Sequence, residues 1–235
     1  FFYAGGLRAL MVELGNKLDL SVKTVTGKTL GECVKGAKNY NSDVIRTLDN
    51  PVYHEGSLAV LKGNLAPDGA VIKPAAMDPK FQKHRGPAIV ANSYSELKEI
   101  INDENYPITA DHILILRNAG PKGGPGMPEW GMIPMPKALL KQGHRDMIRL
   151  SDARMSGTSY GACILHVAPE AYIGGPLALI KNGDIIEVDI PERKLNVDIS
   201  ENELSNRREK WKEPEPRYER GYGYIYSKHI EQADK

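Results

Sequence analysis

The chain carries the run Arg-Asn-Ala-Gly-Pro-Lys-Gly-Gly-Pro-Gly-Met-Pro-Glu at residues 117–129 and the run Ser-Asp-Ala-Arg-Met-Ser-Gly-Thr at residues 151–158. Each run follows a short apolar stretch that predicts a strand. The first run ends on a carboxylate, Glu129, and the second presents a hydroxyl, Ser156. Glycine and proline let a backbone approach a ligand closely and hold its shape. We therefore expect two loops on a rigid scaffold, where binding and catalytic groups tend to lie.

The composition is that of an ordinary soluble globular protein. Of 235 residues, 41% are hydrophobic and 26% are charged. The net charge is +1 and the basic residues are spread along the chain. This argues against a nucleic-acid or membrane-surface partner, because both require clustered positive charge. No apolar stretch approaches the ~18 residues of a membrane-spanning helix.

The two cysteines, Cys33 and Cys163, lie far apart in the sequence and form no Cys-X-X-Cys pair. They imply no disulfide framework, so we expect a cytoplasmic protein. An iron–sulfur cluster requires several thiolates, so neither cysteine is expected to be a cluster ligand. The apolar neighbours of Cys163 predict a buried strand residue.

The chain opens on Phe1-Phe2-Tyr3, and apolar residues then recur at helical spacing, at positions 7, 10, 11 and 14. A helix already under way at the first turn predicts a piece of a longer protein, with some chemistry upstream. We expect three parts. Residues 1–50 are a remnant or linker of a preceding domain, residues 51–215 form a β-rich domain with both loops, and residues 216–235 are a tail without clear periodicity.

The order of elements predicts an α+β fold that is rich in strands. Capping boxes at Ser93 and Ser200 predict helices to about Asn102 and Trp211, and a third helix is expected at 136–142. Short apolar runs predict strands at 58–61, 70–72, 88–90, 112–116, 147–150, 163–167, 177–180, 184–190 and 194–199.

The two loops resemble the signatures of the dihydroxy-acid and aldonic-acid dehydratase family. Residues 26–32, 63–70, 166–171 and 174–179 agree with the same family. The resemblance covers nearly the whole chain and implies the C-terminal part of a longer enzyme. It implies a mobile, swivelling, β-barrel-like domain that packs against an N-terminal α/β domain, of which residues 1–50 would be the remnant.

The resemblance also implies cofactors and roles. The upstream domain of the family carries three cysteines for an iron–sulfur cluster and most of the Mg²⁺ ligands. The glutamate of its glycine-rich motif is a Mg²⁺ ligand, which corresponds to Glu129. Its proposed base is the serine after an Arg-Met or Arg-Phe pair, which corresponds to Ser156. The family is expected to form a homo-oligomer, a dimer or a tetramer, and this isolated chain is expected to be inactive.

Within the family, the run Asp-Ala-Arg-Met-Ser-Gly-Thr resembles the sugar-acid branch. The branched-chain dihydroxy-acid dehydratases more often have Asp-Gly-Arg-Phe-Ser-Gly-Gly. Ala153, Met155 and Thr158 therefore favour dehydration of an aldonate to a 2-keto-3-deoxy acid. The alternative substrate is a branched-chain 2,3-dihydroxy acid.

The residues alone leave simpler readings open. Ser156 can be a turn residue and Glu129 a solvated loop acid. Thr158 either binds substrate or caps the turn. Lys122 either meets a substrate carboxylate or lies on the surface. A phosphate-binding loop at residues 120–126 is disfavoured because the Gly-Lys-Ser/Thr ending is absent.

Two further alternatives stay open at this point. Asp152 and Arg154 can form an ion pair with each other, or Asp152 can make a core polar contact. A non-catalytic binding or swivelling module is the competing class of function, and a phosphohistidine carrier is its sharpest form. That form needs a histidine in a Gly/Thr-rich loop, and none of the six histidines lies in one. His166 is expected to be structural.

Overall fold

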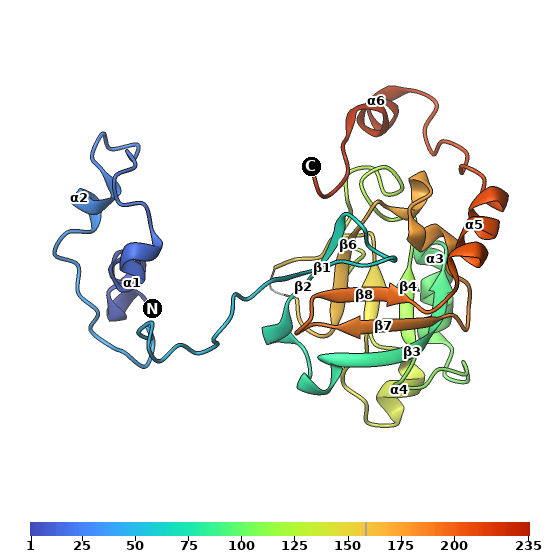
Figure 1. Ribbon diagram of the computed structural model, residues 1–235, viewed down its shortest axis with the longest axis horizontal. Coiled ribbons are helices and arrows are strands. Elements are labelled where there is room, and N and C mark those ends of the chain that lie inside the picture. Colours follow the sequence, from blue (N-terminus) through green and yellow to red (C-terminus); the bar gives the residue numbers. More distant parts are fainter. Residues whose placement is uncertain (158) are drawn as a thin grey trace. The chain divides into compact units, whose positions relative to one another are not determined.

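The computed structural model describes residues 1–157 and 159–235. The chain divides into two compact units, Phe1–Gly56 and Ser57–Lys235, which we call the first and the second unit (Figure 1). In the residues that are described, no helix is both long and apolar enough to cross a lipid bilayer.

The first unit is small and its core is sparse. Its elements are η1 (Phe2–Ala4), α1 (Gly6–Leu14), η2 (Gly15–Lys17) and α2 (Leu30–Val34). Helix α2 begins at a capping box, in which Thr29 and Glu32 each bind the backbone N–H of the other. Ala4, Ala9 and Ile45 form the buried cluster, whereas the side chains of Phe2 and Tyr3 are 83% and 93% exposed. That this unit derives from an α/β domain stays a prediction.

The second unit is built on one eight-stranded mixed sheet with the order β1-β2-β6-β5-β4-β3-β7-β8. Strands β3, β4, β5 and β6 are parallel, and antiparallel pairs flank them on both sides. The strands are β1 (Ala59–Leu61), β2 (Gly69–Ile72), β3 (Lys83–Ala91), β4 (Ile113–Leu116), β5 (Arg149–Ser151), β6 (Cys163–Ala168), β7 (Ile185–Asp189) and β8 (Lys194–Val197).

The sheet curls until its edges meet, which gives a barrel-like shape. Lys62, just after β1, forms an isolated parallel bridge with Lys194 at the start of β8. Its N–H donates to the carbonyl oxygen of Arg193 over 2.9 Å, and its carbonyl oxygen accepts from Leu195 over 3.0 Å. The Asn64 side chain adds two bonds to the backbone of Val197. The expected β-rich, barrel-like α+β fold is confirmed.

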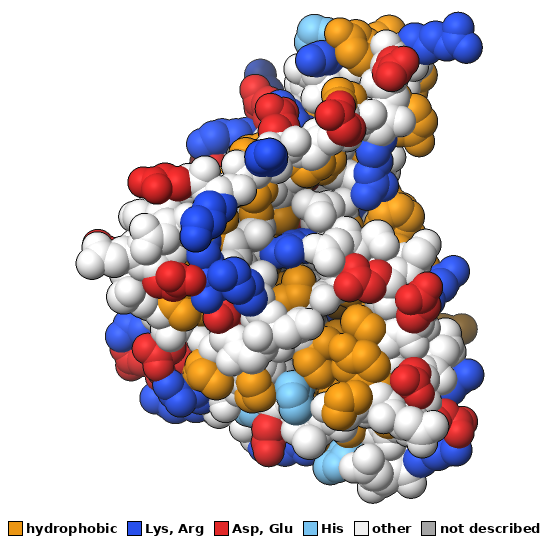
Figure 2. Space-filling view, turned by 90° about the vertical axis from the view of Figure 1, so that its right-hand side faces the viewer, with side chains coloured by type: hydrophobic (Ala, Val, Ile, Leu, Met, Phe, Trp, Pro, Cys, Tyr) orange, Lys and Arg blue, Asp and Glu red, His pale blue; other side chains and the backbone are white. Residues whose placement is uncertain are grey.

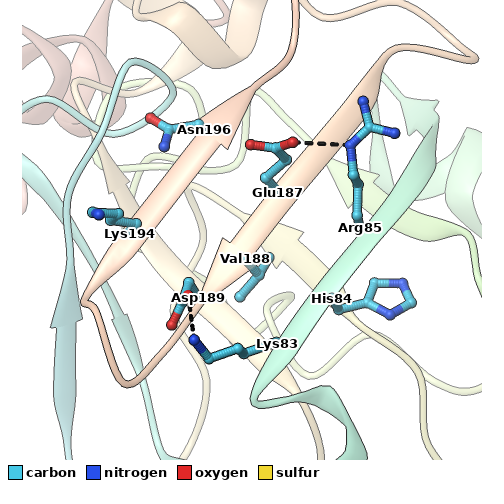
Figure 3. Close-up of a pocket in the computed structure, with 8 residues that line it drawn as sticks. All are labelled: Lys83, His84, Arg85, Glu187, Val188, Asp189, Lys194 and Asn196. Carbon is cyan, nitrogen blue, oxygen red and sulfur yellow. Dashed lines mark hydrogen bonds and ion pairs between the residues drawn. The ribbon is translucent and has the colours of Figure 1, made fainter.

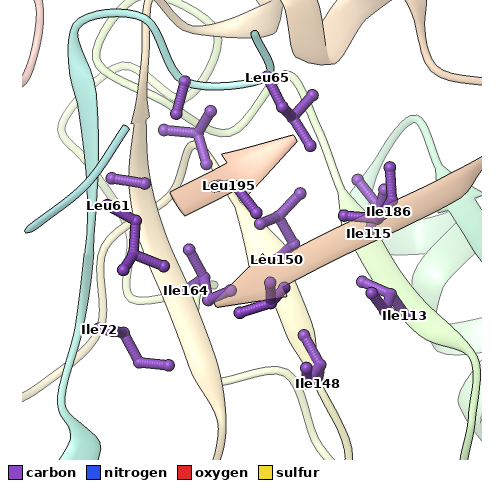
Figure 4. Packing of buried hydrophobic residues seen from close by; sticks show 14 of the residues in the cluster. Leu61, Leu65, Ile72, Ile113, Ile115, Ile148, Leu150, Ile164, Ile186 and Leu195 are labelled. Carbon is purple, nitrogen blue, oxygen red and sulfur yellow. The ribbon is translucent and has the colours of Figure 1, made fainter. Parts of the chain in front are cut away.

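Side-chain alternation along the sheet creates two cores. In β4, Ile113 and Ile115 point into the barrel, while Leu114 and Leu116 point outward under the helices. The barrel interior packs aliphatic side chains from strands across the sheet, among them Leu61, Ile164 and Leu195 (Figure 4). A strand that is buried on both faces has a continuous apolar sequence, which explains the run Ile-Leu-Ile-Leu.

Helices α3 (Tyr94–Asn102), α4 (Lys137–Lys141) and α5 (Glu201–Lys210) pack on the outside of the barrel, whereas α6 (Gly221–His229) lies apart from the strands and buries no residue (Figure 1). The 3₁₀ turns are η3 (Pro74–Ala76), η4 (Pro79–Phe81), η5 (Ala171–Ile173) and η6 (Pro176–Leu179). Ser93 and Ser200 accept the expected capping bonds from Glu96 and Glu203. Arg207 of α5 binds both Asp184 and the carbonyl oxygen of Leu179, which docks this polar helix on the barrel.

Two sequence-based expectations for the second unit are wrong. Residues 177–180 were expected to be a strand, but Pro176 opens a 3₁₀ turn there, because proline fits the first turn of a helix and has no N–H for a sheet ladder. The stretch 216–235 was expected to lack regular structure, but it contains α6.

Gly63 offers a test of the barrel closure. A Cβ atom at this position would collide with the carbonyl oxygen of Leu195. We expect Gly63→Ala to lower the free energy of unfolding of the second unit by roughly 2 kcal/mol or more. Trp130 and Trp211 both lie in this unit, so denaturation followed by tryptophan fluorescence reports on it. Gly157→Ala is the control, because a Cβ there meets nothing within 4 Å; equal losses in both variants would contradict the closure argument.

Candidate functional site

The topology brings the starts of the two loops together. Strands β4 and β5 are parallel neighbours, and Leu116 and Ser151 pair at their carboxyl ends. The loop after β4 and the loop after β5 therefore leave the same edge of the sheet. In open α/β sheets this edge is where ligands bind.

Asp152 anchors the two loops to each other. Its carboxylate is fully buried and accepts three backbone hydrogen bonds. The donors are Asn118 at 3.1 Å and Ala119 at 2.9 Å from the glycine-rich loop, and Ala171 at 2.9 Å from the segment after β6. Of the two roles left open for Asp152, the structure supports the core polar contact.

Glu170 occupies the inside of the glycine-rich loop. It is fully buried, and its two oxygens accept from the N–H groups of Lys122 at 2.8 Å and Gly123 at 2.9 Å. A Cβ at Gly120 would lie 2.6 Å from Glu170 Oε2, so the close approach requires glycine. Gln232 in the C-terminal stretch donates to Glu170 Oε1 over 2.7 Å. This loop therefore holds the chain's own carboxylate where a phosphate loop would hold a ligand.

Arg154 connects the Ser156 loop to Glu129. Its guanidinium donates to the carbonyl oxygen of Met127 over 2.5 Å and lies 3.2 Å from Glu129 Oε1. The backbone adds a bond from Gly131 N–H to the Arg154 carbonyl oxygen, at 2.8 Å. Glu129 and Ser156 thus belong to loops in direct contact, through the residue two positions before Ser156.

Ser156 lines a pocket of about 390 Å³ on the outer face of β2 and β6. Val71 and Leu165, which pair across these strands, contribute apolar surface to it. The other lining residues are Ser57, Leu58, Ile72, Lys73, Met155, Gly157, Cys163 and His166. The pocket lies beside a half-buried hydroxyl, so it can receive a small molecule against Ser156.

Sequence reasoning missed two members of this pocket. Lys73, just past β2, donates from Nζ to the Gly157 carbonyl oxygen over 2.7 Å. His166 was expected to be structural, and it lines the pocket with a backbone in the left-handed region, at φ 53°. Burial and the charge of Arg154 lower the pKa of His166, which favours its neutral form. The signal in the sequence was weak, because both residues reach the site from other strands.

The remaining predicted residues lie elsewhere. Thr158, expected to bind substrate, lies outside the described residues. Lys122 lines a different pocket, which it shares with Tyr172 and with residues between 213 and 228. A role for Lys122 in substrate binding stays a prediction.

Comparison with known proteins decides the family. Residues 43–235 match the family model described as dihydroxy-acid/6-phosphogluconate dehydratase C-terminal. The chain belongs to this dehydratase family. It is 48% identical to a 6-deoxy-6-sulfo-D-gluconate dehydratase of Pseudomonas putida, over 100% of the chain and 41% of that protein.

Other members of the dehydratase family are similarly close. The chain is 45% identical to an L-arabinonate dehydratase of Rhizobium leguminosarum, over 100% of the chain and 41% of the relative. It is 44% identical to a dihydroxy-acid dehydratase of Methanothrix thermoacetophila, over 99% of the chain and 42% of the relative. The chain therefore spans about two fifths of the length of the curated relatives that it matches.

Glu129 fits one position of a Mg²⁺ site. Its carboxylate is 49% exposed and sits at the end of the glycine-rich loop, where it can exchange Arg154 for a cation. Mg²⁺ is commonly held by one or two carboxylates together with substrate and water. No group of three His, Cys, Asp or Glu side chains within 1–157 and 159–235 is placed to hold a metal.

The cysteines do not fit an iron–sulfur cluster. Cys33 belongs to the first unit and Cys163 to the second, and such a cluster requires several thiolates. Burial raises the pKa of Cys163 to about 11, so it stays a thiol at neutral pH.

A second pocket, of about 410 Å³, lies on β3, β7 and β8 and has a different character (Figure 3). Its charges are paired across the strands, Lys83 with Asp189 and Arg85 with Glu187, both at 2.9 Å. These pairs lie at the surface, with Asp189 half-buried, and cross-strand pairs of this kind stabilise a sheet surface. On the face seen in Figure 2, acidic and basic side chains are likewise interspersed, around a hydrophobic patch.

Asp152 gives a test of the anchor. Burial raises its pKa from 3.8 to about 6, with a further rise from the charge of Glu170 and opposition from its three N–H donors. Between these values the folded chain holds a proton that the unfolded chain has released. The contribution of protonated Asp152 to the free energy of unfolding is therefore complete below about pH 4 and is lost as the pH rises through 6.

We expect Asp152→Asn to destabilise the second unit by about 1–3 kcal/mol, because an N–H donor loses its acceptor. The difference in unfolding free energy between wild type and variant should shrink from about pH 4 to about pH 7. Denaturant titrations across this range measure it, with the exposed Asp111→Asn as the control for lost charge. A difference that grows with pH would contradict this assignment.

Proposed function

We propose that this chain is the C-terminal part of a hydro-lyase that removes water from a sugar acid, an aldonate, to give a 2-keto-3-deoxy acid. The observation that carries the proposal is the contact of Arg154 with Glu129 and Met127, which joins the Ser156 loop to the glycine-rich loop. Similarity to dehydratases of sulfogluconate and L-arabinonate supports the reaction class.

In the proposed reaction, Ser156 acts as an alkoxide base on the substrate. It takes the C2 proton, and the electron pair of that bond forms the C2–C3 double bond as the C3–O bond breaks. The proton then passes to the departing hydroxide, which leaves as water, and the enol becomes the ketone as its C2 hydroxyl loses a proton and C3 gains one. Water bound to a metal can have its pKa lowered from 15.7 to about 7, which is the scale of assistance that a serine base needs.

Glu129 is proposed to hold Mg²⁺ beside this base. Bound there, Mg²⁺ would supply a positive charge for the substrate carboxylate and for the oxygen that becomes negative at C2. Arg154 would keep the Glu129 side chain oriented when the cation is absent. We further propose that an iron–sulfur cluster and most Mg²⁺ ligands are held by a preceding domain.

Two alternatives compete. Dehydration of branched-chain 2,3-dihydroxy acids is supported by the 44% identity to dihydroxy-acid dehydratases. The sequence around Met155, which lines the Ser156 pocket, favours the aldonate. A non-catalytic swivelling module is the other class, and the pocket beside a loop hydroxyl argues against it.

We also propose partners for this chain: a preceding domain of the same protein and further copies of the enzyme. Exposed aromatic side chains in the first unit, such as Phe2 and Tyr3, suit a surface that packs against a preceding domain of the same protein. We propose that the enzyme is cytoplasmic and forms a dimer or a tetramer.

We expect the isolated chain to be folded in its second unit but inactive, because the described residues provide neither a cluster site nor a complete metal site. The measurement is dehydration of aldonates with added iron, sulfide and Mg²⁺, beside the complete gene product as a positive control. Turnover by the isolated chain would contradict this expectation.

In the complete gene product, we expect Ser156→Ala to lower kcat roughly 10²–10⁴-fold, because it removes the base. The KM should change much less. Glu129→Gln is the matched comparison. It weakens Mg²⁺ binding, so added Mg²⁺ should restore part of its rate. Added Mg²⁺ should not restore the rate of the Ser156→Ala variant. Near-normal turnover by Ser156→Ala, with cofactor content intact by absorbance, would make Ser156 a turn residue.

A further inference from the structure

The Ser156 pocket has an unbalanced charge. Eleven residues line it, and none of them is an aspartate or a glutamate. Lys73 and His166 are the lining side chains that can carry positive charge, and the lowered pKa of His166 favours its neutral form. The ammonium group of Lys73 is therefore the main charge that faces this pocket.

Lys73 is held at a defined place in the pocket. It follows β2, and its Nζ donates to the carbonyl oxygen of Gly157, the residue directly after Ser156, over 2.7 Å. Continuing the β2–β6 register of Val71 with Leu165 and Ile72 with Ile164 sets Lys73 opposite Cys163, on the pocket face. An ammonium group has three N–H donors, so the bond to Gly157 leaves two that can face the pocket.

The surroundings make this charge effective. Val71, Leu165 and Cys163 give the pocket apolar walls, and burial keeps Cys163 uncharged. Charges interact more strongly beside low-dielectric walls than in water. A negative charge that develops on the Ser156 loop would therefore be stabilised by the Lys73 ammonium, although the Lys73–Gly157 hydrogen bond is itself solvent-exposed.

We propose that Lys73 is a positioning residue for Ser156: it tethers the loop through Gly157 and stabilises, by its charge, the alkoxide form of the serine. In this role Lys73 exchanges no proton with the substrate. The inference rests on the proposed function for its catalytic consequence, but the electrostatic effect on position 156 can be measured without turnover.

The test uses a thiol as a reporter in the complete gene product. Ser156→Cys introduces a group whose ionisation follows from the rate of iodoacetamide alkylation against pH, read by mass spectrometry of the peptide that contains position 156. Three substitutions are added to this background. Lys73→Arg keeps the charge, Lys73→Gln keeps a hydrogen-bond donor without the charge, and Lys73→Met keeps neither. Lys98→Met, on the exposed face of α3, is the control for an equal change in net charge.

We expect the thiol pKa to rise by roughly one unit or more in Lys73→Gln and Lys73→Met, and to change little in Lys73→Arg and Lys98→Met. With Ser156 restored, Lys73→Met should lower kcat at least tenfold with little change in KM, and Lys73→Arg should recover part of the rate. Circular dichroism checks the folding of each variant, and Lys73→Gln keeps the test decisive if Lys73→Met unfolds.

A thiol pKa that is the same with lysine and glutamine at position 73 would overturn the inference, whatever the activity. If the wild-type protein dehydrates no sugar acid or dihydroxy acid, the proposed function fails, while the thiol measurement still decides the role of Lys73.

Discussion

The buried carboxylate of Asp152 is the interaction on which the geometry of the site depends. It joins the loop after β4, the loop after β5 and the segment after β6 through backbone N–H groups at 118, 119 and 171. A buried charge is costly unless it is hydrogen-bonded, and here three donors offset that cost. Because all three partners are backbone groups, the anchor fixes the paths of the loops and leaves their side chains available.

Glu170 extends this arrangement into the glycine-rich loop. It follows β6, fills the loop from inside and is itself held by Gln232 from the C-terminal stretch. The two buried acids lie near enough for the charge of Glu170 to raise the pKa of Asp152. Glycine is required at position 120 by the close approach of a protein carboxylate. A glycine-rich sequence can therefore indicate an internal anchor as well as a ligand site.

Local signals in the sequence predicted most of the elements of the second unit. The capping serines at 93 and 200 and the continuous apolar run of β4 act within a few residues, so their outcome could be predicted. The barrel closure was expected only from the family resemblance and not from any local signal, because it depends on Lys62 meeting Lys194 across 132 positions. Helix α6 was missed because it has little amphipathic pattern and buries no residue.

The candidate site shows the same division. Ser156 and Glu129 could be named from the loops and the family resemblance, and the contact of their loops follows from parallel β4 and β5. Lys73 reaches the Ser156 loop from 84 residues away, and His166 turns toward the pocket through an unusual backbone conformation. Neither the reach of Lys73 nor the backbone conformation of His166 leaves a spacing pattern in the sequence. Only the folded chain therefore assigns these two residues to the pocket.

The most direct test of the account is a crystal structure of the complete gene product with an unreactive aldonate analogue and Mg²⁺. The account predicts that the C2 carbon of the analogue lies beside Ser156 Oγ, with Mg²⁺ on the Glu129 carboxylate and the chain of the sugar in the pocket of β2 and β6. An analogue bound away from Ser156, with Glu129 still paired to Arg154, would contradict it.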